Sequence, residues 1–557
     1  MKNSNIILFF LSFYLDSFCQ PINDSLKHKI DLLFTKWDTP FSPGCAIAVV
    51  RNDSIIYSKG YGMANLEYSI PNEPKTIFHV ASVSKQFTAW AIIRLAEEGK
   101  ISLDDDIRKY LIWFPDLKEK ISIRNLLNHT SGIRDQWQLL TLAGTESEDL
   151  VTQQHIIKIL SKQQGLNFKP GDKYMYSNSG YSLLAEIVKA VTGQTLRQFS
   201  DSTIFKPLGM YDSHIHDECT EIVKGRSYSY DRIGSSHFTN SILSYSNSGA
   251  TGLFTNVIDM SKWVMNFYTP QIGSQKDIDT LTKNAILNNG REIPYAAGLV
   301  TELFKGWQQY SHSGGDAGYR SYISVIPDIK MGFIIFSNLA DFNPEEKAIE
   351  IKNILVRDKS LQTNTRTTIR RDSVAAQIRD ISKIKIYAGY YIGEDGLPIS
   401  FEIVRGKFYY HIYEQSNFLI EESKDVFSIP QTPDVSFAFS IDGKDTILNV
   451  KSKLQEYRLI KYNPNTVQTN NYLNKYTGTY YCPELDCTYN IEIKDHSLML
   501  TNAKYSDTKI TLIGSEHLMT NNWWISHLMV IRDKNNNVTG FEINCHRIMH
   551  LRFNKLR

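Results

Sequence analysis

The sequence predicts a mixed α/β (α+β) domain, in which a central antiparallel sheet is flanked by helices, followed by two small antiparallel β-barrels or sandwiches. Three observations predict this fold class. Residues 20–357 mix helical and strand patterns, a polar and charged stretch follows at 358–383, and the chain beyond it has strand patterns only. A length of 557 residues suits about three to four domains. We therefore expect a linker at 358–383 and β-domains at 384–465 and 466–557.

The first nineteen residues have the features of a signal peptide. Lys2 precedes a mostly apolar run at 6–15, which is too short to span a bilayer, and small residues stand at the cleavage positions before Gln20. A buried first helix and a lipoprotein acylated at Cys19 are the alternatives, and the residues before Cys19 disfavour the second. We expect an exported protein, periplasmic or secreted, and no later run of apolar residues predicts a membrane span.

The first domain begins with an amphipathic helix around Leu26, Ile30 and Leu33. Two strands joined around Asn52-Asp53 follow as a hairpin, and a second pair of strands ends the domain; their ranges are 45–50, 54–60, 321–327 and 331–337. Between these hairpins, residues 82–98 are apolar on nearly every side and end at Gly99, which predicts a helix in the domain interior.

The C-terminal region contains two segments that resemble each other. One opens with Tyr387-Ala388-Gly389-Tyr390-Tyr391 and the other with Tyr476-Thr477-Gly478-Thr479-Tyr480. Short alternating runs predict strands of a meander at 401–404, 407–412, 489–493 and 529–532. The paired Trp523-Trp524 belongs either to a core or to a binding surface. These domains can cap a site, restrict substrate size or mediate contacts.

Charge and cysteine content exclude several classes of protein. Lys and Arg number 61 against 59 Asp and Glu, a net charge of +2, which gives no basis for nucleic-acid or membrane-surface binding. Without Cys19 five cysteines remain, and an odd number cannot be fully paired. Cys482 and Cys487 are close enough to bridge across a turn, which the sequence leaves open. Their spacing has no matching His or Cys cluster nearby, which disfavours a zinc site. The sequence has no other convincing ligand cluster, and we expect neither a metal nor an organic cofactor.

Ser82-Val83-Ser84-Lys85 begins the buried helix. Residues three positions apart share a helix face, so the Lys85 amine can lie beside the Ser82 hydroxyl. Unpaired N–H groups at a helix start can stabilise an oxyanion, and a desolvated lysine can accept a proton near neutral pH. The alternative is an ordinary capping serine with a solvated lysine, which a buried helix disfavours.

Two further motifs carry groups suited to catalysis. Tyr176-Ser177-Asn178 stands at a turn before a helical run, where a tyrosine can exchange a proton if a nearby cation lowers its pKa, and Asn178 can donate to a substrate carbonyl. His312-Ser313-Gly314-Gly315 precedes a strand pattern, and its glycines allow a substrate backbone to approach closely. Taken singly, each also fits an ordinary turn.

Together the motifs S-x-x-K, Y-x-N and H-S-G resemble those of the serine β-lactamase and penicillin-binding superfamily. Supporting stretches at 60–64, 126–132 and 249–254 also resemble it, and the resemblance covers about residues 22–356. It is most similar to the class C β-lactamase-like hydrolases, which include D-aminopeptidases, D-alanyl-D-alanine carboxypeptidases and esterases. The resemblance implies a β-lactamase-like domain at 20–357, and D-aminopeptidases are similar in their three-domain layout.

The resemblance also implies roles for individual residues. Ser82 is the acylated nucleophile, Lys85 its base, Tyr176 the shared proton carrier, and His312 the counterpart of a lysine in the third motif. Asn178, Ser313 and Gly314 then orient the substrate, and the Ser82 and Gly315 N–H groups form the oxyanion hole. His129 lies in a family-like stretch, where we expect a buried hydrogen bond that holds a loop.

One departure from the family affects the expected substrate. A neutral histidine at position 312 does not supply the cation that lysine offers to a substrate carboxylate, although Arg320 can replace it. We expect an exported serine hydrolase that acts on an ester or amide of D-amino-acid or peptidoglycan-derived origin, with a small molecule or peptide as its partner. The alternative is a penicillin-recognising protein, β-lactamase or D,D-carboxypeptidase that acylates on β-lactams. The sequence leaves the oligomeric state open.

Overall fold

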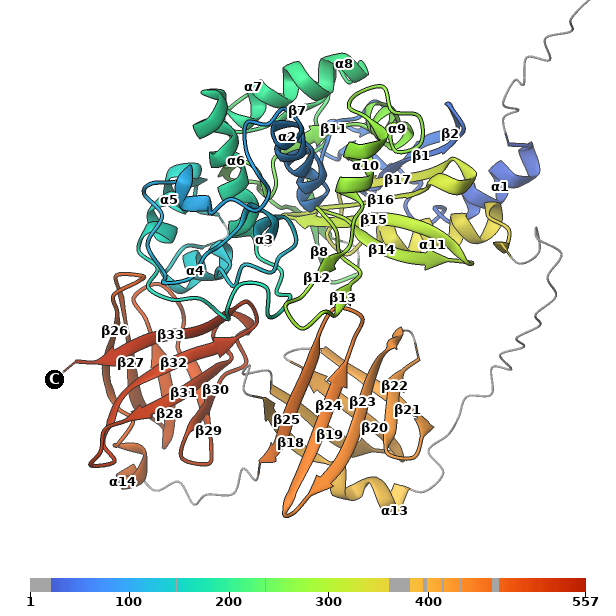
Figure 1. The fold of residues 1–557 in the computed structure, drawn as a ribbon. Coiled ribbons are helices and arrows are strands. Elements are labelled where there is room, and N and C mark those ends of the chain that lie inside the picture. The colour runs from blue at the N-terminus through green and yellow to red at the C-terminus, as the bar shows by residue number, and fades with distance from the viewer. Residues whose placement is uncertain are drawn as a thin grey trace, which may run out of the picture.

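The computed structural model describes residues 22–146, 148–235, 237–359, 381–393, 398–412, 415–430, 432–462 and 470–556. The predicted signal peptide and most of the predicted linker lie outside these residues. The described part contains a mixed α/β domain followed by two β-barrels (Figure 1).

The mixed domain is built on a six-stranded sheet in the order β14-β15-β16-β17-β1-β2. Every neighbouring pair is antiparallel. The strands are β1 (Cys45–Arg51), β2 (Ser54–Tyr61), β14 (Val300–Phe304), β15 (Trp307–Asp316), β16 (Tyr319–Ile326) and β17 (Met331–Ser337). Pairing of Cys45 with Ser337 joins the two predicted hairpins into one sheet, because β1 lies directly beside β17.

Helices cover both faces of this sheet. Ala46, Ala48 and Val50 face a core that includes α2 (Lys85–Glu97), α6 (Asn178–Thr192) and α9 (Val257–Asn266). The alternate residues of β1 face a second core with α1 (Asp24–Leu32) and α11 (Pro344–Leu355). Because successive strand residues point to opposite faces, a sheet covered on both sides needs strands that are apolar throughout, as β1 is.

The other elements of the domain are short. The helices are α3 (Ile123–Leu127), α4 (Gln136–Leu142), α5 (Gln153–Ser161), α7 (Leu196–Ser200), α8 (Lys206–Leu208) and α10 (Gln275–Leu281). The strands are β3 (Met63–Asn65), β4 (Ile70–Pro71), β5 (Phe78–His79), β6 (Val151–Thr152), β7 (His214–Ile215), β8 (Tyr230–Ile233), β9 (His237–Asn240), β10 (Tyr245–Ser246), β11 (Leu253–Thr255), β12 (Ala285–Ile286) and β13 (Glu292–Ile293).

Each C-terminal domain is a closed antiparallel barrel of eight strands, which decides between the barrels and sandwiches that the sequence left open. The first contains β18 (Gly389–Gly393), β19 (Pro398–Val404), β20 (Lys407–Ile412), β21 (Gln415–Ser423), β22 (Val426–Ile429), β23 (Thr432–Asp442), β24 (Asp445–Lys451) and β25 (Glu456–Tyr462). The second contains β26 (Gly478–Cys482), β27 (Cys487–Lys494), β28 (Ser497–Thr501), β29 (Thr508–Ile513), β30 (His517–Met519), β31 (His527–Arg532), β32 (Val538–Cys545) and β33 (Ile548–Lys555).

The two resembling sequence motifs make the same local structure in both barrels. The Tyr391 hydroxyl donates to the Tyr387 carbonyl at 3.0 Å, and Tyr480 donates to Tyr476 at 2.6 Å. Cys482 and Cys487 face each other across the β26–β27 pair and remain free thiols. Among the described helices, none combines the length and apolar character that crossing a bilayer requires.

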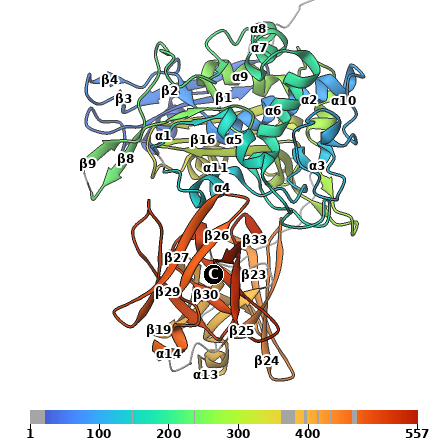
Figure 2. The same ribbon diagram turned by 90° about the vertical axis from the view of Figure 1, so that its left-hand side faces the viewer.

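Both barrels lie on the same side of the mixed domain (Figures 1 and 2). The second barrel is bound through Arg134, a fully buried side chain that donates to Glu484 Oε2 at 2.6 Å and to the carbonyls of Met549 and His550 at 3.0 Å each. Apolar residues of this barrel also belong to the same core as α2. The first barrel contacts the domain more lightly, for example where the Gln455 amide donates to the Tyr174 carbonyl at 3.2 Å.

Candidate active site

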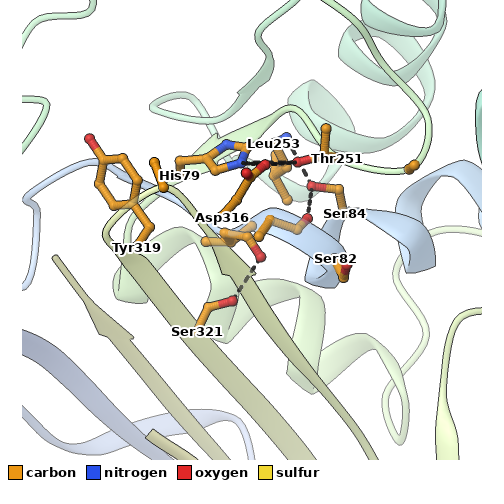
Figure 3. Close-up of polar contacts among 12 residues, drawn as sticks. His79, Ser82, Ser84, Thr251, Leu253, Asp316, Tyr319 and Ser321 are labelled. Carbon is orange, nitrogen blue, oxygen red and sulfur yellow. Dashed lines mark hydrogen bonds and ion pairs between the residues drawn. The ribbon is translucent and has the colours of Figure 1, made fainter. Parts of the chain in front are cut away.

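Ser82 lies in a short 3-10 turn, Ala81–Ser84, that leads directly into α2. The sequence predicts one helix from residue 82, whereas the α-helix begins at Lys85. Ala81 has a φ of +47°, a left-handed conformation that is costly for a residue with a side chain. Ser84 holds this turn: its hydroxyl donates to the Ala81 carbonyl at 2.6 Å and accepts from the Leu253 N–H at 2.9 Å (Figure 3).

The Lys85 amine is completely buried beside Ser82. Its Nζ lies 3.0 Å from Ser82 Oγ, 2.9 Å from Asn178 Oδ1 and 2.7 Å from the Ala250 carbonyl oxygen. The last two atoms can only accept hydrogen bonds. A neutral amine therefore donates its two hydrogens to them and directs its lone pair at the Ser82 hydroxyl.

Burial lowers the pKa of Lys85 from 10.5 to about 7. Arg547 lowers it further by charge repulsion, whereas the carboxylates of Asp135 and Asp316 raise it. A substantial fraction of Lys85 is consequently unprotonated at neutral pH, as a general base requires.

Tyr176 lies against the same amine, with Lys85 Nζ 4.9 Å from the centre of its ring. Burial raises the pKa of Tyr176 to about 12, although a hydrogen bond with Ser82 and the charge of Arg547 both act to lower it. A cation does act to lower this pKa, as the sequence analysis required for proton exchange, but desolvation of the phenolate is the larger effect. At neutral pH Tyr176 is a phenol, which can donate a proton.

Asn178 begins α6 and links Lys85 to a buried carboxylate. Its Oδ1 accepts from Lys85, while its backbone N–H and its Nδ2 donate to Asp135 Oδ2 at 2.7 and 2.9 Å. These bonds fix the side-chain amide so that its oxygen faces the lysine. One of its two Nδ2 hydrogens is thus committed to Asp135, which leaves a single hydrogen for a substrate carbonyl.

The third motif precedes strand β16, as the sequence predicts, and itself lies in a strand. His312, Ser313, Gly314 and Gly315 are all in β15, which pairs with β16. A Cβ added at Gly314 would stand 2.4 Å from the Val80 carbonyl oxygen, so only glycine lets β15 pack this closely against the turn that carries Ser82. Glycines usually weaken strands, so the sequence left a glycine-rich turn open as the alternative for this motif.

A chain of hydrogen bonds fixes His312 in one neutral tautomer. The Ser177 N–H donates to His129 Nδ1 at 3.1 Å, so the His129 Nε2–H donates to the Tyr295 hydroxyl at 3.0 Å. Tyr295 then donates to His312 Nε2 at 3.2 Å, and the His312 Nδ1–H donates to the Ser313 carbonyl at 2.5 Å. His129 thus holds the loop before α6, as the sequence predicts.

His312 therefore contributes no cation to the site. Burial lowers its pKa to about 4, and both ring nitrogens are engaged within the protein. Arg320 does not supply the missing positive charge either. Its Nη1 donates to the carbonyls of Ala317 and Tyr319 at 2.9 and 2.7 Å, and Arg320 is not among the residues that line the cavity.

The described residues enclose a cavity of about 900 Å³ above Ser82. Ser82, Tyr176, Asn178 and residues 312–315 all line it, so the predicted site residues come together, with Lys85 directly beneath. The second barrel forms part of the wall, through Tyr505, Trp523, Trp524 and Arg547. The sequence analysis anticipated this contribution only for Trp523-Trp524, which it assigned to a core or a binding surface. It did not identify Arg547, because no sequence motif relates this residue to Ser82.

A second group of polar side chains lies apart from the lining of this cavity. His214, His216 and Glu221 bring one ligand-type atom each within 4.8 Å of one another. Arg197 holds the Glu221 carboxylate with two hydrogen bonds of 2.6 and 2.7 Å, so its charge is already compensated. Burial also lowers the pKa of both histidines, so the group consists of an Arg197–Glu221 ion pair beside two histidines.

A helix-flanked antiparallel sheet with a serine–lysine pair at the start of its buried helix defines the class of β-lactamase-fold serine hydrolases. The family model described as Beta-lactamase matches residues 34–356. The chain belongs to the β-lactamase family.

Individual relatives agree with this assignment. Penicillin-binding protein 4* of Bacillus subtilis is 29% identical over 339 residues, 58% of this chain and 74% of that protein. A D-aminopeptidase of Brucella anthropi is 26% identical over 342 residues, 60% of this chain and 62% of that enzyme. The alignments thus span about three fifths of the D-aminopeptidases. The structure of an octameric penicillin-binding protein homologue from Pyrococcus abyssi has the same fold, with a TM-score of 0.53 at 24% identity over 78% of this chain and 99% of that one.

Proposed function

We propose that this protein is an exported serine hydrolase that forms an acyl-enzyme on Ser82 and cleaves ester or amide bonds of D-amino-acid or peptidoglycan-derived substrates. One observation carries the proposal. The buried Lys85 amine has two obligate acceptors for its hydrogens and a pKa of about 7, so its lone pair is available to the Ser82 hydroxyl 3.0 Å away.

Acylation then proceeds by proton transfer within this group. Ser82 Oγ bonds to the substrate carbonyl carbon while its proton passes to Lys85 Nζ. The Ser82 and Gly315 N–H groups stabilise the oxyanion. Tyr176 donates its phenolic proton to the leaving amine or alkoxide as the scissile bond breaks, and Lys85 returns a proton to the phenolate. Water releases the acyl group by the same steps in reverse.

The substrate class in this proposal rests on relatives. Several similar proteins are named D-aminopeptidases, and one is a penicillin-binding protein. The name D-aminopeptidase points to substrates of the D configuration. The second barrel narrows the opening above Ser82, which favours small substrates over folded proteins.

Intact mass spectrometry tests the proposal. The protein is exposed to a fluorophosphonate and, separately, to a penicillin, with Ser82→Ala as the control. We expect one fluorophosphonate adduct that the variant lacks. A penicilloyl adduct that persists for hours would favour the penicillin-recognising alternative, and rapid loss of that adduct would favour β-lactam hydrolysis. Absence of any fluorophosphonate adduct at Ser82 would refute the assignment of the nucleophile.

A further inference from the structure

The second barrel brings a fixed cation into the wall of the cavity. Arg547 lies in the turn between β32 and β33, and its guanidinium carbon is 4.8 Å from the centre of the Tyr176 ring. Its backbone is held from both sides, because its N–H donates to Gln138 Oε1 and its carbonyl accepts from Asn167 Nδ2, at 2.9 Å each. The backbone of Arg547 is therefore fixed, while its side chain, which is 33% exposed, remains partly accessible to solvent.

The charge of Arg547 is only partly compensated. Its Nη1 lies 3.8 Å from Asp135 Oδ2, near the limit of an ion pair. That carboxylate already accepts hydrogen bonds from the N–H and Nδ2 of Asn178 and from the Trp137 N–H. A guanidinium has five N–H donors, and among the described residues none of them forms a hydrogen bond to the protein.

The charges of the other residues that line the cavity favour binding of an anion next to Arg547. Among the described lining residues, Arg547 is the one lysine or arginine, and His312 is neutral. The acidic lining residues are Glu146, Glu148 and Asp316, and the last is bound to His79 Nε2 at 3.2 Å (Figure 3). A negatively charged group of a substrate is therefore attracted to the Arg547 part of the wall and repelled by the rest.

We propose that Arg547 binds a carboxylate of the substrate, so that this hydrolase acts preferentially on substrates with a free carboxylate. This inference rests on the proposed function at Ser82. A guanidinium matches a carboxylate with two parallel hydrogen bonds, which a partly desolvated wall strengthens. The cation that the third sequence motif lacks is thus supplied by the C-terminal barrel.

Matched pairs of substrates test the inference in the full-length protein. N-acetyl-D-alanyl-D-alanine and its C-terminal amide place the charge on the leaving side of the scissile bond. D-glutamyl and D-glutaminyl p-nitroanilide place it on the acyl side. The readout is the acid-to-amide ratio of kcat/KM, because both members of a pair use the same Lys85 and effects on its pKa cancel in the ratio.

We expect the unaltered protein to prefer the acid in at least one pair. Arg547→Ala should lower that ratio about 10- to 100-fold, mainly through KM, and Arg547→Lys should restore part of it. Lys504→Ala is the control. It removes another cation of the same barrel, paired with Asp149 at 3.1 Å on the surface, and should leave the ratio unchanged.

The outcomes separate this inference from the proposed function. If the neutral fluorophosphonate does not label Ser82, the proposed function fails. If it labels Ser82 but the protein shows no preference for the acid, or Arg547→Ala lowers both members equally, Arg547 merely positions Asp135 and the inference is overturned. If no substrate is turned over, N-acetyl-D-alanine should protect Ser82 from labelling better than its amide; equal protection, or none, also overturns the inference.

Discussion

Acylation of Ser82 should depend on pH through Lys85. In the proposed mechanism the neutral amine is the base, and the pKa of Lys85 is about 7 because burial disfavours the ammonium form. The neutral fraction is then about one tenth at pH 6 and about nine tenths at pH 8. The rate constant for acylation should therefore rise about tenfold between these two values, about ninefold between pH 5 and pH 6, and level off above pH 8.

The assay is the second-order rate of fluorophosphonate labelling, because this reagent does not ionise between pH 5 and pH 10. Lys85→Arg keeps a permanent cation beside Ser82, so it should abolish the rise and lower the plateau by about 100- to 10,000-fold. Arg547→Ala should move the midpoint to higher pH, since the Arg547 charge lowers the pKa of Lys85.

A midpoint near 10 would refute this reasoning, since it would mean that Lys85 is an ordinary ammonium when the protein is at neutral pH. A midpoint near 4 would instead point to His312, whose pKa burial lowers to that value. A rate independent of pH would show that neither group is the base.

Three substitutions test the surrounding structure. Tyr176→Phe should slow amide hydrolysis about 100- to 10,000-fold, measured as kcat, because the leaving group loses its proton donor. Gly314→Ala should abolish labelling of Ser82, since its Cβ would stand 2.4 Å from a backbone oxygen. Gly315→Ala is the control and should still be labelled, because the nearest atom to a Cβ at that position is 3.5 Å away. Arg134→Ala should destabilise the protein by about 3–5 kcal/mol in urea unfolding, because Glu484 is left buried and unpaired.

Each substitution has an outcome that contradicts its reasoning. Tyr176→Phe with unchanged kcat would exclude the phenol as a proton donor. Equal labelling of Gly314→Ala and Gly315→Ala would show that the close packing of β15 does not hold the Ser82 turn. The double variant Arg134→Met/Glu484→Leu removes both charges, so it should recover much of the stability lost in Arg134→Ala; no recovery would show that the unpaired charge is not the cause.

Local spacing predicted much of the fold and the centre of the site. Ser82 and Lys85 are three positions apart, which is less than one helical turn, so their proximity follows from the backbone alone. The hairpin around Asn52-Asp53 and the strand Met331–Ser337 are likewise indicated by runs of a few mostly apolar residues and the turn residues beside them. For the motif in β15 the sequence left an ordinary turn open as the alternative, because the Val80 carbonyl that requires a glycine there is a neighbour only in the folded chain.

The sequence by itself indicated the family and predicted a nucleophile and a base, because these depend on short motifs whose geometry is local. Only the tertiary structure decided that Tyr176 remains a phenol, that His312 is neutral and that Arg547 lies in the cavity wall. A pKa depends on everything that surrounds a group, and the position of Arg547 depends on how the second barrel docks through Arg134. The pKa of a group and the position of Arg547 both depend on contacts between residues far apart in the chain, which local sequence spacing does not reveal.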